Sequence, residues 1–73
     1  MNDEVNVKIC RYINEIYRPL YRSNRDFCLT CGIDEKVGRR IQKEDYNPSV
    51  KLFKQICEAH DTKMSEILAA IGE

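Results

Sequence analysis

Two capping residues and one glycine constrain residues 23–43 more strongly than any other part of the chain is constrained. Ser23 can cap a helix over residues 24–31, because its hydroxyl accepts a backbone N–H that has no partner in the first helical turn. Gly32 follows, and glycine adopts a positive φ at little cost, which suits a tight turn. Asp34 can then cap a second helix, whose positive end its charge favours. We therefore predict two short helices joined by a turn.

The second of these helices, residues 34–43, is dominated by charged side chains. They are Glu35, Lys36, Arg39, Arg40 and Lys43. Two helices and a glycine turn within about twenty residues have the spacing of a helix-turn-helix motif. A polar, basic helix in that motif favours nucleic-acid recognition.

The length and composition fit one small folded domain. The 73 residues are 42% hydrophobic, which argues for a packed core rather than disorder. No apolar run approaches the roughly 18 residues that a membrane span needs, and the polar, acidic start is unlike a signal peptide. We therefore expect a cytoplasmic protein that does not engage a membrane. Its four cysteines should be reduced or metal-bound rather than paired in disulfides.

Charge is unevenly distributed along a chain whose net charge is zero. Residues 11–43 hold eight Lys and Arg against four acidic residues, whereas residues 44–73 hold three against six. The basic half contains the predicted motif. A local positive patch of this kind can attract phosphate even on a neutral protein.

Apolar periodicity predicts a further helix before the motif, from about Val5 to Arg18. Its expected apolar stripe is Val5, Ile9, Ile13, Ile16, Tyr17 and Leu20. Pro19 should end this helix at Arg18, because the residue before a proline avoids the α region.

Two more helices are predicted after the motif. An Asn-Pro turn and a Ser49 cap precede the first, residues 50–60. Its expected core positions are Val50, Leu52, Phe53, Ile56 and Cys57. Thr62 should cap the second, residues 63–71, which Gly72 closes. The sequence thus predicts an all-α chain of five helices without strands.

In their ungapped order these positions resemble the phage-repressor/Cro-type helix-turn-helix domain, also called the xenobiotic-response-element family. The resemblance rests on Ile9, Ile13 and Ile16, Ser23-Asn24, Phe27-Cys28, Gly32-Ile33, the helix 34–43, Asn47-Pro48-Ser49 and the closing FKQICEAHDTKMSEIL. It implies a five-helix lambda-repressor-like domain over residues 1–73, with a core from about 5 to 71 and the motif at 23–43. It also implies a transcriptional regulator or repressor that binds double-stranded DNA as a homodimer, without a cofactor.

The same resemblance assigns roles to individual side chains. Such folds place the second helix of the motif in the major groove. Glu35 and Lys36 should then face bases, and Arg39 and Arg40 should face bases or phosphates. The candidate contacts to the DNA phosphate backbone are Asn24 at the start of the first motif helix, together with Arg25, Lys43, Tyr46 and Asn47. The alternative to DNA binding is that these residues form an ordinary solvated surface, with ion pairs between charged side chains of the same helix.

Three positions depart from the family pattern. Gly38 replaces a β-branched core residue, and a glycine within a helix costs about 1 kcal/mol relative to alanine. It lets another helix or the nucleic-acid backbone approach closely, or it is a weak spot. Gln42 stands where the family usually has Glu, and Glu44 where it usually has the Gly that ends the helix.

Two rival interpretations use other residues. Cys28, Cys31, Cys57 and His60 form a CxxC…CxxH pattern that is typical of zinc sites. Against it, the three cysteines fall on predicted core positions, where reduced cysteine packs well. The other rival is an antitoxin-like protein-interaction domain. We expect no enzyme, because the single His has no evident catalytic partners.

Overall fold

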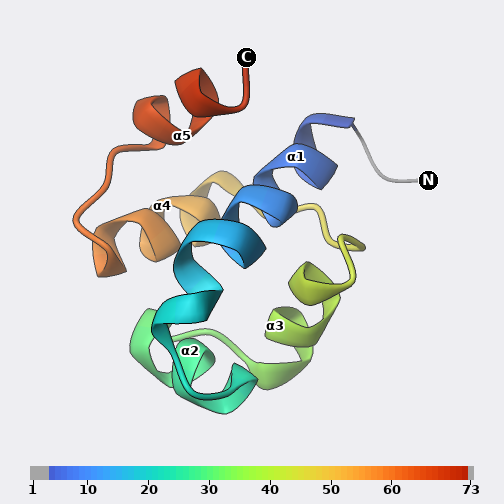
Figure 1. The fold of residues 1–73 in the computed structure, drawn as a ribbon, viewed down its shortest axis with the longest axis vertical. Helices are drawn as coiled ribbons and strands as arrows, with labels where there is room; N and C mark the ends of the chain where they lie inside the picture. The colour runs from blue at the N-terminus through green and yellow to red at the C-terminus, as the bar shows by residue number, and fades with distance from the viewer. Residues whose placement is uncertain (1–3, 73) are drawn as a thin grey trace.

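The computed structural model describes residues 4–72, which form five α-helices and no strand. The predicted all-α class is thus confirmed for these residues, whereas residues 1–3 and 73 of the predicted domain lie outside them. The elements are α1 (Glu4–Tyr12), the π-helix η1 (Ile13–Tyr17), the 3-10 turn η2 (Arg18–Leu20), α2 (Asn24–Cys31), α3 (Glu35–Gln42), α4 (Val50–Ala59) and α5 (Met64–Ala70). Figure 1 shows α5 at one end of the molecule and α2 with α3 at the other, with α1 and η1 between them. Within the described chain, no helix has both the length and the apolar character to cross a membrane.

The core takes apolar side chains from all five α-helices and from η1. Its buried members are Ile9, Cys10, Ile13, Tyr17, Phe27, Cys28, Cys31, Ile41, Phe53, Ile56, Cys57 and Ile67. Burying a side chain such as Phe27 or Ile41 fully contributes about 1.5–3 kcal/mol to stability. Ile41 thereby fixes the C-terminal half of α3 against the rest of the molecule.

Three of the predicted capping residues, Ser23, Asp34 and Ser49, and the predicted turn at Gly32 are confirmed. The Ser23 hydroxyl accepts the backbone N–H three residues on at 3.2 Å, and the Ser49 hydroxyl does the same at 3.1 Å. The Asp34 carboxylate accepts the N–H two residues on at 2.8 Å. Gly32 has a φ of +70°, the left-handed conformation that ends α2.

The apolar stripe predicted for the first helix is wrong in its second half. There the backbone forms a π-helical turn, in which the Arg18 N–H donates to the carbonyl of Ile13, five residues back. The wider turn rotates the following side chains away from a 3.6-residue period. Ile16 and Leu20 are consequently 49% and 70% exposed, whereas Tyr17 is buried.

Three further local predictions are wrong. Arg18 keeps helical backbone angles before Pro19, which sits inside the 3-10 turn, so the chain does not leave the helical region at Arg18. Val50 is 72% exposed because it lies in the first turn of α4 on the side away from the core. Thr62 does not cap α5, which begins after Lys63; its hydroxyl instead donates to the His60 carbonyl at 3.0 Å.

Candidate nucleic-acid interface

Gly38 lets α3 pack directly on α2. A Cβ atom at this position would overlap the Cys28 sulfur and the Asn24 side-chain oxygen. Any larger residue would therefore push the two helices apart or displace both side chains. Of the explanations that the sequence left open, close approach of another helix is the one that the packing supports, and that helix is α2.

The guanidinium of Arg18, the first residue of η2, links Asn14 of η1 to both motif helices. Arg18 Nε donates to Asn14 Oδ1 and Nη1 donates to Asn24 Oδ1, each at 3.0 Å. Arg18 Nη2 donates to the backbone carbonyl of Gly38 at 2.8 Å. The Arg18 guanidinium also lies over the Phe27 ring, 4.8 Å from its centroid. Burial lowers the pKa of this guanidinium from its ordinary value.

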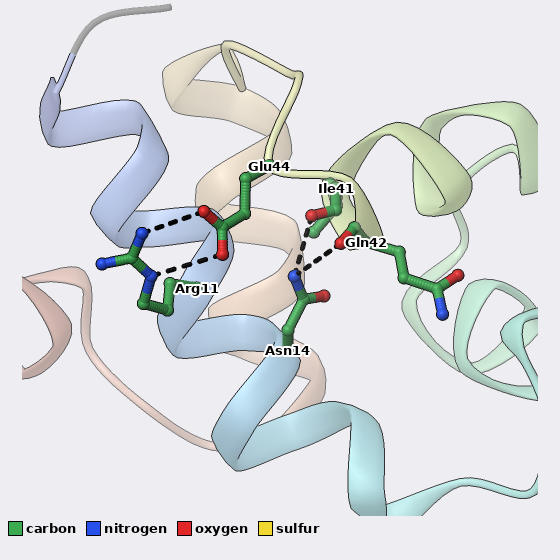
Figure 2. A network of polar contacts seen from close by, with 5 residues as sticks. All are labelled: Arg11, Asn14, Ile41, Gln42 and Glu44. Carbon is green, nitrogen blue, oxygen red and sulfur yellow. Dashed lines mark hydrogen bonds and ion pairs between the residues drawn. The ribbon is translucent and has the colours of Figure 1, made fainter.

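The C-terminal end of α3 is held by side chains from α1 and η1 (Figure 2). Asn14 Nδ2 donates to the carbonyls of Ile41 and Gln42 at 2.9 and 3.3 Å. Arg11 binds both carboxylate oxygens of Glu44, at 3.0 and 3.3 Å. Glu44 itself has a φ of +59°, so it occupies the left-handed position that glycine usually takes at a helix end. The helix therefore ends there without a glycine.

Most of the predicted DNA-contacting side chains are exposed on or beside the motif. The exposed ones are Arg25, Glu35, Lys36, Arg39, Arg40, Lys43 and Asn47. Two are half-buried, Asn24 and Tyr46. The structure thus brings these residues to neighbouring segments, namely α2, α3 and the loop that follows α3.

Three of these side chains make contacts within the protein. Asn24 accepts from Arg18, and its Nδ2 donates to the Glu35 carbonyl at 3.1 Å. Its side-chain groups are therefore engaged inside the motif. Arg40 Nε donates to the Asp45 carbonyl at 3.0 Å, and its guanidinium lies over the Tyr46 ring, 5.1 Å from the centroid. Arg40 and Tyr46 thus support one another at the end of α3.

In the folded protein, basic side chains still outnumber acidic ones at the motif. Of the eight basic residues in 11–43, Arg11 and Arg18 bind groups of the protein itself. The other six are exposed: Arg22, Arg25, Lys36, Arg39, Arg40 and Lys43. Residues 22–43 contain only three carboxylates, and two of them, Asp26 and Asp34, accept backbone N–H groups at helix starts. The surface of α2 and α3 is therefore positive overall.

The four residues of the zinc pattern do not form a metal-binding group. Among residues 4–72, no three His, Cys, Asp or Glu side chains are arranged to hold a metal ion. Cys28, Cys31 and Cys57 are buried in the core and unpaired. Burial raises the pKa of each thiol, to about 11 for Cys31, where the neighbouring Cys28 contributes. The thiols therefore pack as neutral apolar groups.

The histidine of that pattern has both ring nitrogens occupied. His60 Nδ1 lies 2.8 Å from the Ile56 carbonyl, which can only accept, so Nδ1 carries the hydrogen. In the neutral ring Nε2 then accepts from the Tyr21 hydroxyl at 2.7 Å. The ring also stacks on Tyr17, with centroids 3.9 Å apart. His60 thus packs against the core at the C-terminal end of α4.

Sequence reasoning missed the contacts of Asn14 and Arg18 with the motif and of Arg11 with Glu44, the residue directly after it. The three are spaced by three and four residues, so they share one side of the first helical segment. That polar stripe beside the apolar one was the available signal. It did not identify partners, which are mostly backbone carbonyls twenty or more residues away.

No protein-family model, curated protein or solved structure matches this chain. Its function is therefore argued from its own residues.

Proposed function

We propose that this chain is a sequence-specific double-stranded DNA-binding protein that regulates transcription by occupying an operator, with α3 in the major groove. The observation that carries the proposal is the arrangement of α3. Its inner side, at Gly38 and Ile41, is buried against the protein, while its outer side presents charged residues. A helix held in this way can enter a groove about 12 Å wide without exposing its apolar side.

The roles of the outer residues follow from their positions along α3. Glu35 and Lys36 lie in the first turn, the part of a recognition helix that meets base edges. Lys36 can donate to guanine O6 and N7, and Glu35 can accept from a cytosine amino group. Arg39 and Arg40, one turn later, reach bases or phosphates. This order gives specificity at the start of the helix and affinity along it.

Phosphate contacts come from the residues that flank α3. Arg25 lies at the start of α2, and Lys43 caps the end of α3. Asn47 is exposed in the following loop, next to Tyr46, whose ring supports Arg40. Asn24 contributes its backbone N–H, in the first turn of α2, because its side chain is bonded to Arg18 and Glu35.

A single copy presents one recognition helix, so we propose binding as a homodimer. Dimers of such motifs contact half-sites roughly 34–36 Å apart. Sedimentation of the protein with and without a duplex that carries two half-sites measures this. The expected result is two chains on that duplex and one on a duplex with a single half-site.

Selection of bound duplexes from random DNA tests the proposed function. The wild type should enrich a defined sequence. Its retardation in an electrophoretic shift should then be lost in Lys36→Ala/Arg40→Ala. The matched control is Lys54→Ala/Lys63→Ala, which removes the same charge from exposed positions on α4 and at the start of α5. Equal retardation of both double variants would overturn the role of α3.

A further inference from the structure

The guanidinium of Arg18 touches three elements at once. Its three donor bonds go to Asn14 on η1, Asn24 on α2 and the Gly38 carbonyl on α3. Arginine presents its donors in a rigid plane, so bonds in three directions fix the relative placement of the groups that accept them. The Phe27 ring against the guanidinium restricts its rotation.

Hydrogen bonds from Arg18, and from the two asparagines that it contacts, reach α3 at its beginning, middle and end. Asn24 donates to the Glu35 carbonyl, in the first turn of α3. Arg18 donates to the Gly38 carbonyl, in the middle. Asn14 donates to the carbonyls of Ile41 and Gln42, in the last turn. One connected set of side chains therefore controls both the distance of α3 from the core and its rotation about its own axis.

The π-helical turn η1 places two of these side chains. A regular α-helix would continue the 3.6-residue period through Ile16 and Leu20 and direct them to the core. The wider turn instead leaves those two side chains exposed, while Asn14 and Arg18 both reach α3. Turns of this kind are rare, and they are frequent at functional sites.

We propose that Arg18 is a positioning residue for DNA recognition, one that sets the placement of α3 through Gly38 without contacting DNA. This rests on the proposed function, because it assigns α3 the task of meeting bases. Two observations separate Arg18 from the exposed basic residues of the motif. It is half-buried, and all three of its guanidinium nitrogens donate to groups of the protein itself.

A measurement on the free protein tests the hold on α3. In Arg18→Met the ¹³C′ resonance of Gly38 should shift, because its carbonyl loses a charged donor. The amide hydrogens of α3 should exchange faster relative to those of α5. Arg18→Lys retains the charge and most of the stem, so it serves where Arg18→Met does not fold. An unchanged Gly38 resonance and unchanged α3 exchange would overturn the proposal.

Titration with DNA tests the consequence for recognition. The duplex selected by the wild type and an unrelated duplex of equal length are titrated with each variant. Arg18→Met and Arg18→Lys should bind the selected duplex about tenfold more weakly, as for the loss of one good base contact, with a smaller change on the unrelated duplex. Lys54→Met is the charge-matched control for Arg18→Met and should preserve the ratio of the two affinities.

The outcomes separate this proposal from the proposed function. If the wild type selects no duplex, the proposed function fails. The measurement on the free protein then still decides whether Arg18 fixes α3. A shifted Gly38 resonance in Arg18→Met supports this, and an unchanged resonance with unchanged α3 exchange overturns it. If the wild type selects a duplex and the Arg18 variants keep the full affinity ratio, the positioning role is overturned while DNA binding stands.

Discussion

Gly38 lies against Cys28 where α3 packs on α2, and no side-chain atom fits between the two helices at that point. The thiol is buried and bonds weakly to the Asn24 oxygen at 3.6 Å. That same oxygen accepts from Arg18. The glycine that looks like a defect in the sequence is therefore what allows this polar network to form.

Gly38→Ala should destabilise the protein, although alanine is the better helix former. The gain in helix propensity is about 1 kcal/mol, whereas overpacking a buried contact costs typically about 1–3 kcal/mol. The overlap here involves two held side chains, which places the cost near the upper end of that range, so we expect a net loss of about 1–2 kcal/mol in the free energy of unfolding. Urea denaturation measures it. A variant more stable than the wild type would contradict the packing argument.

The control for this prediction is a double-mutant cycle with Cys28→Ala. Removing the sulfur opens space for the new methyl group. Gly38→Ala should therefore cost less in the Cys28→Ala background than in the wild type, which gives a favourable coupling energy. Simple additivity of the two changes would indicate that the overlap with Cys28 is not the cause.

Glu44→Gly separates backbone strain from ion pairing at the end of α3. Glycine removes the cost of a left-handed residue, about 1 kcal/mol, but loses the contact with Arg11. At about 1 M salt the screening length falls to about 3 Å, so the exposed ion pair contributes little. We therefore expect Glu44→Gly to be more stable than the wild type in high salt. The advantage should shrink or reverse at low salt.

Thermal unfolding of both proteins over a series of NaCl concentrations measures this difference. Glu44→Gln is the matched variant, because it loses the charge and keeps the strained backbone. It should not gain the high-salt advantage. Both variants lose the same ion pair, so if Glu44→Gly is no more stable than Glu44→Gln in high salt, relief of strain is not the explanation.

The parts of the fold that follow from local chemistry were predictable. A hydroxyl or carboxylate at a helix start and a glycine at a helix end act on neighbouring backbone groups. Ser23, Asp34 and Gly32 therefore carry their own structural signal. The helix boundaries around them agree closely with the prediction, with α2 at Asn24–Cys31 and α3 at Glu35–Gln42.

The parts that depend on distant contacts were not predictable. The π-helical turn breaks the period on which the stripe assignment of Ile16 and Leu20 rested. The bond from Arg18 to the Gly38 carbonyl crosses twenty residues and ends on a backbone group, which every residue type offers. In the candidate interface, exposure of Lys36 and Arg39 follows from helix periodicity, whereas the engagement of Asn24 follows only from packing.

Stability should fall as the pH rises above about 9, because burial raises the pKa of Cys31 from 9.0 to about 11. Above its unfolded pKa this thiol holds its proton more tightly in the folded chain, so deprotonation favours unfolding. Its contribution is fully present below about pH 9 and is lost as the pH rises to about 11. Burial also raises the pKa of Cys10, Cys28, Cys57, Tyr17 and Tyr21.

Urea midpoints measured under reducing conditions from neutral pH upward check this dependence. Cys31→Ala is the control variant. It should be less stable than the wild type at neutral pH and should lose less stability as the pH rises. A wild-type midpoint that stays constant up to about pH 10.5 would contradict the assignment of the thiol as a buried neutral group.

Lys36 and Lys43 should affect DNA binding in different ways, because they lie at opposite ends of α3. Lys43→Gln removes a phosphate contact, so it should weaken binding to every duplex alike. The slope of log affinity against log salt should become shallower by about 0.9. Lys36→Gln removes a base contact and should relax the preference at one base pair, by about 1–3 kcal/mol.

Fluorescence anisotropy titrations distinguish the two effects. Each variant is titrated against the selected duplex at several salt concentrations, and against duplexes that each carry one base-pair change. Both variants lose one positive charge, so each is the other's control for net charge. If Lys43→Gln alters the preferred base while Lys36→Gln leaves every preference intact, α3 lies in the groove in the opposite direction to the one proposed. If neither variant changes slope or preference, α3 is not the recognition helix.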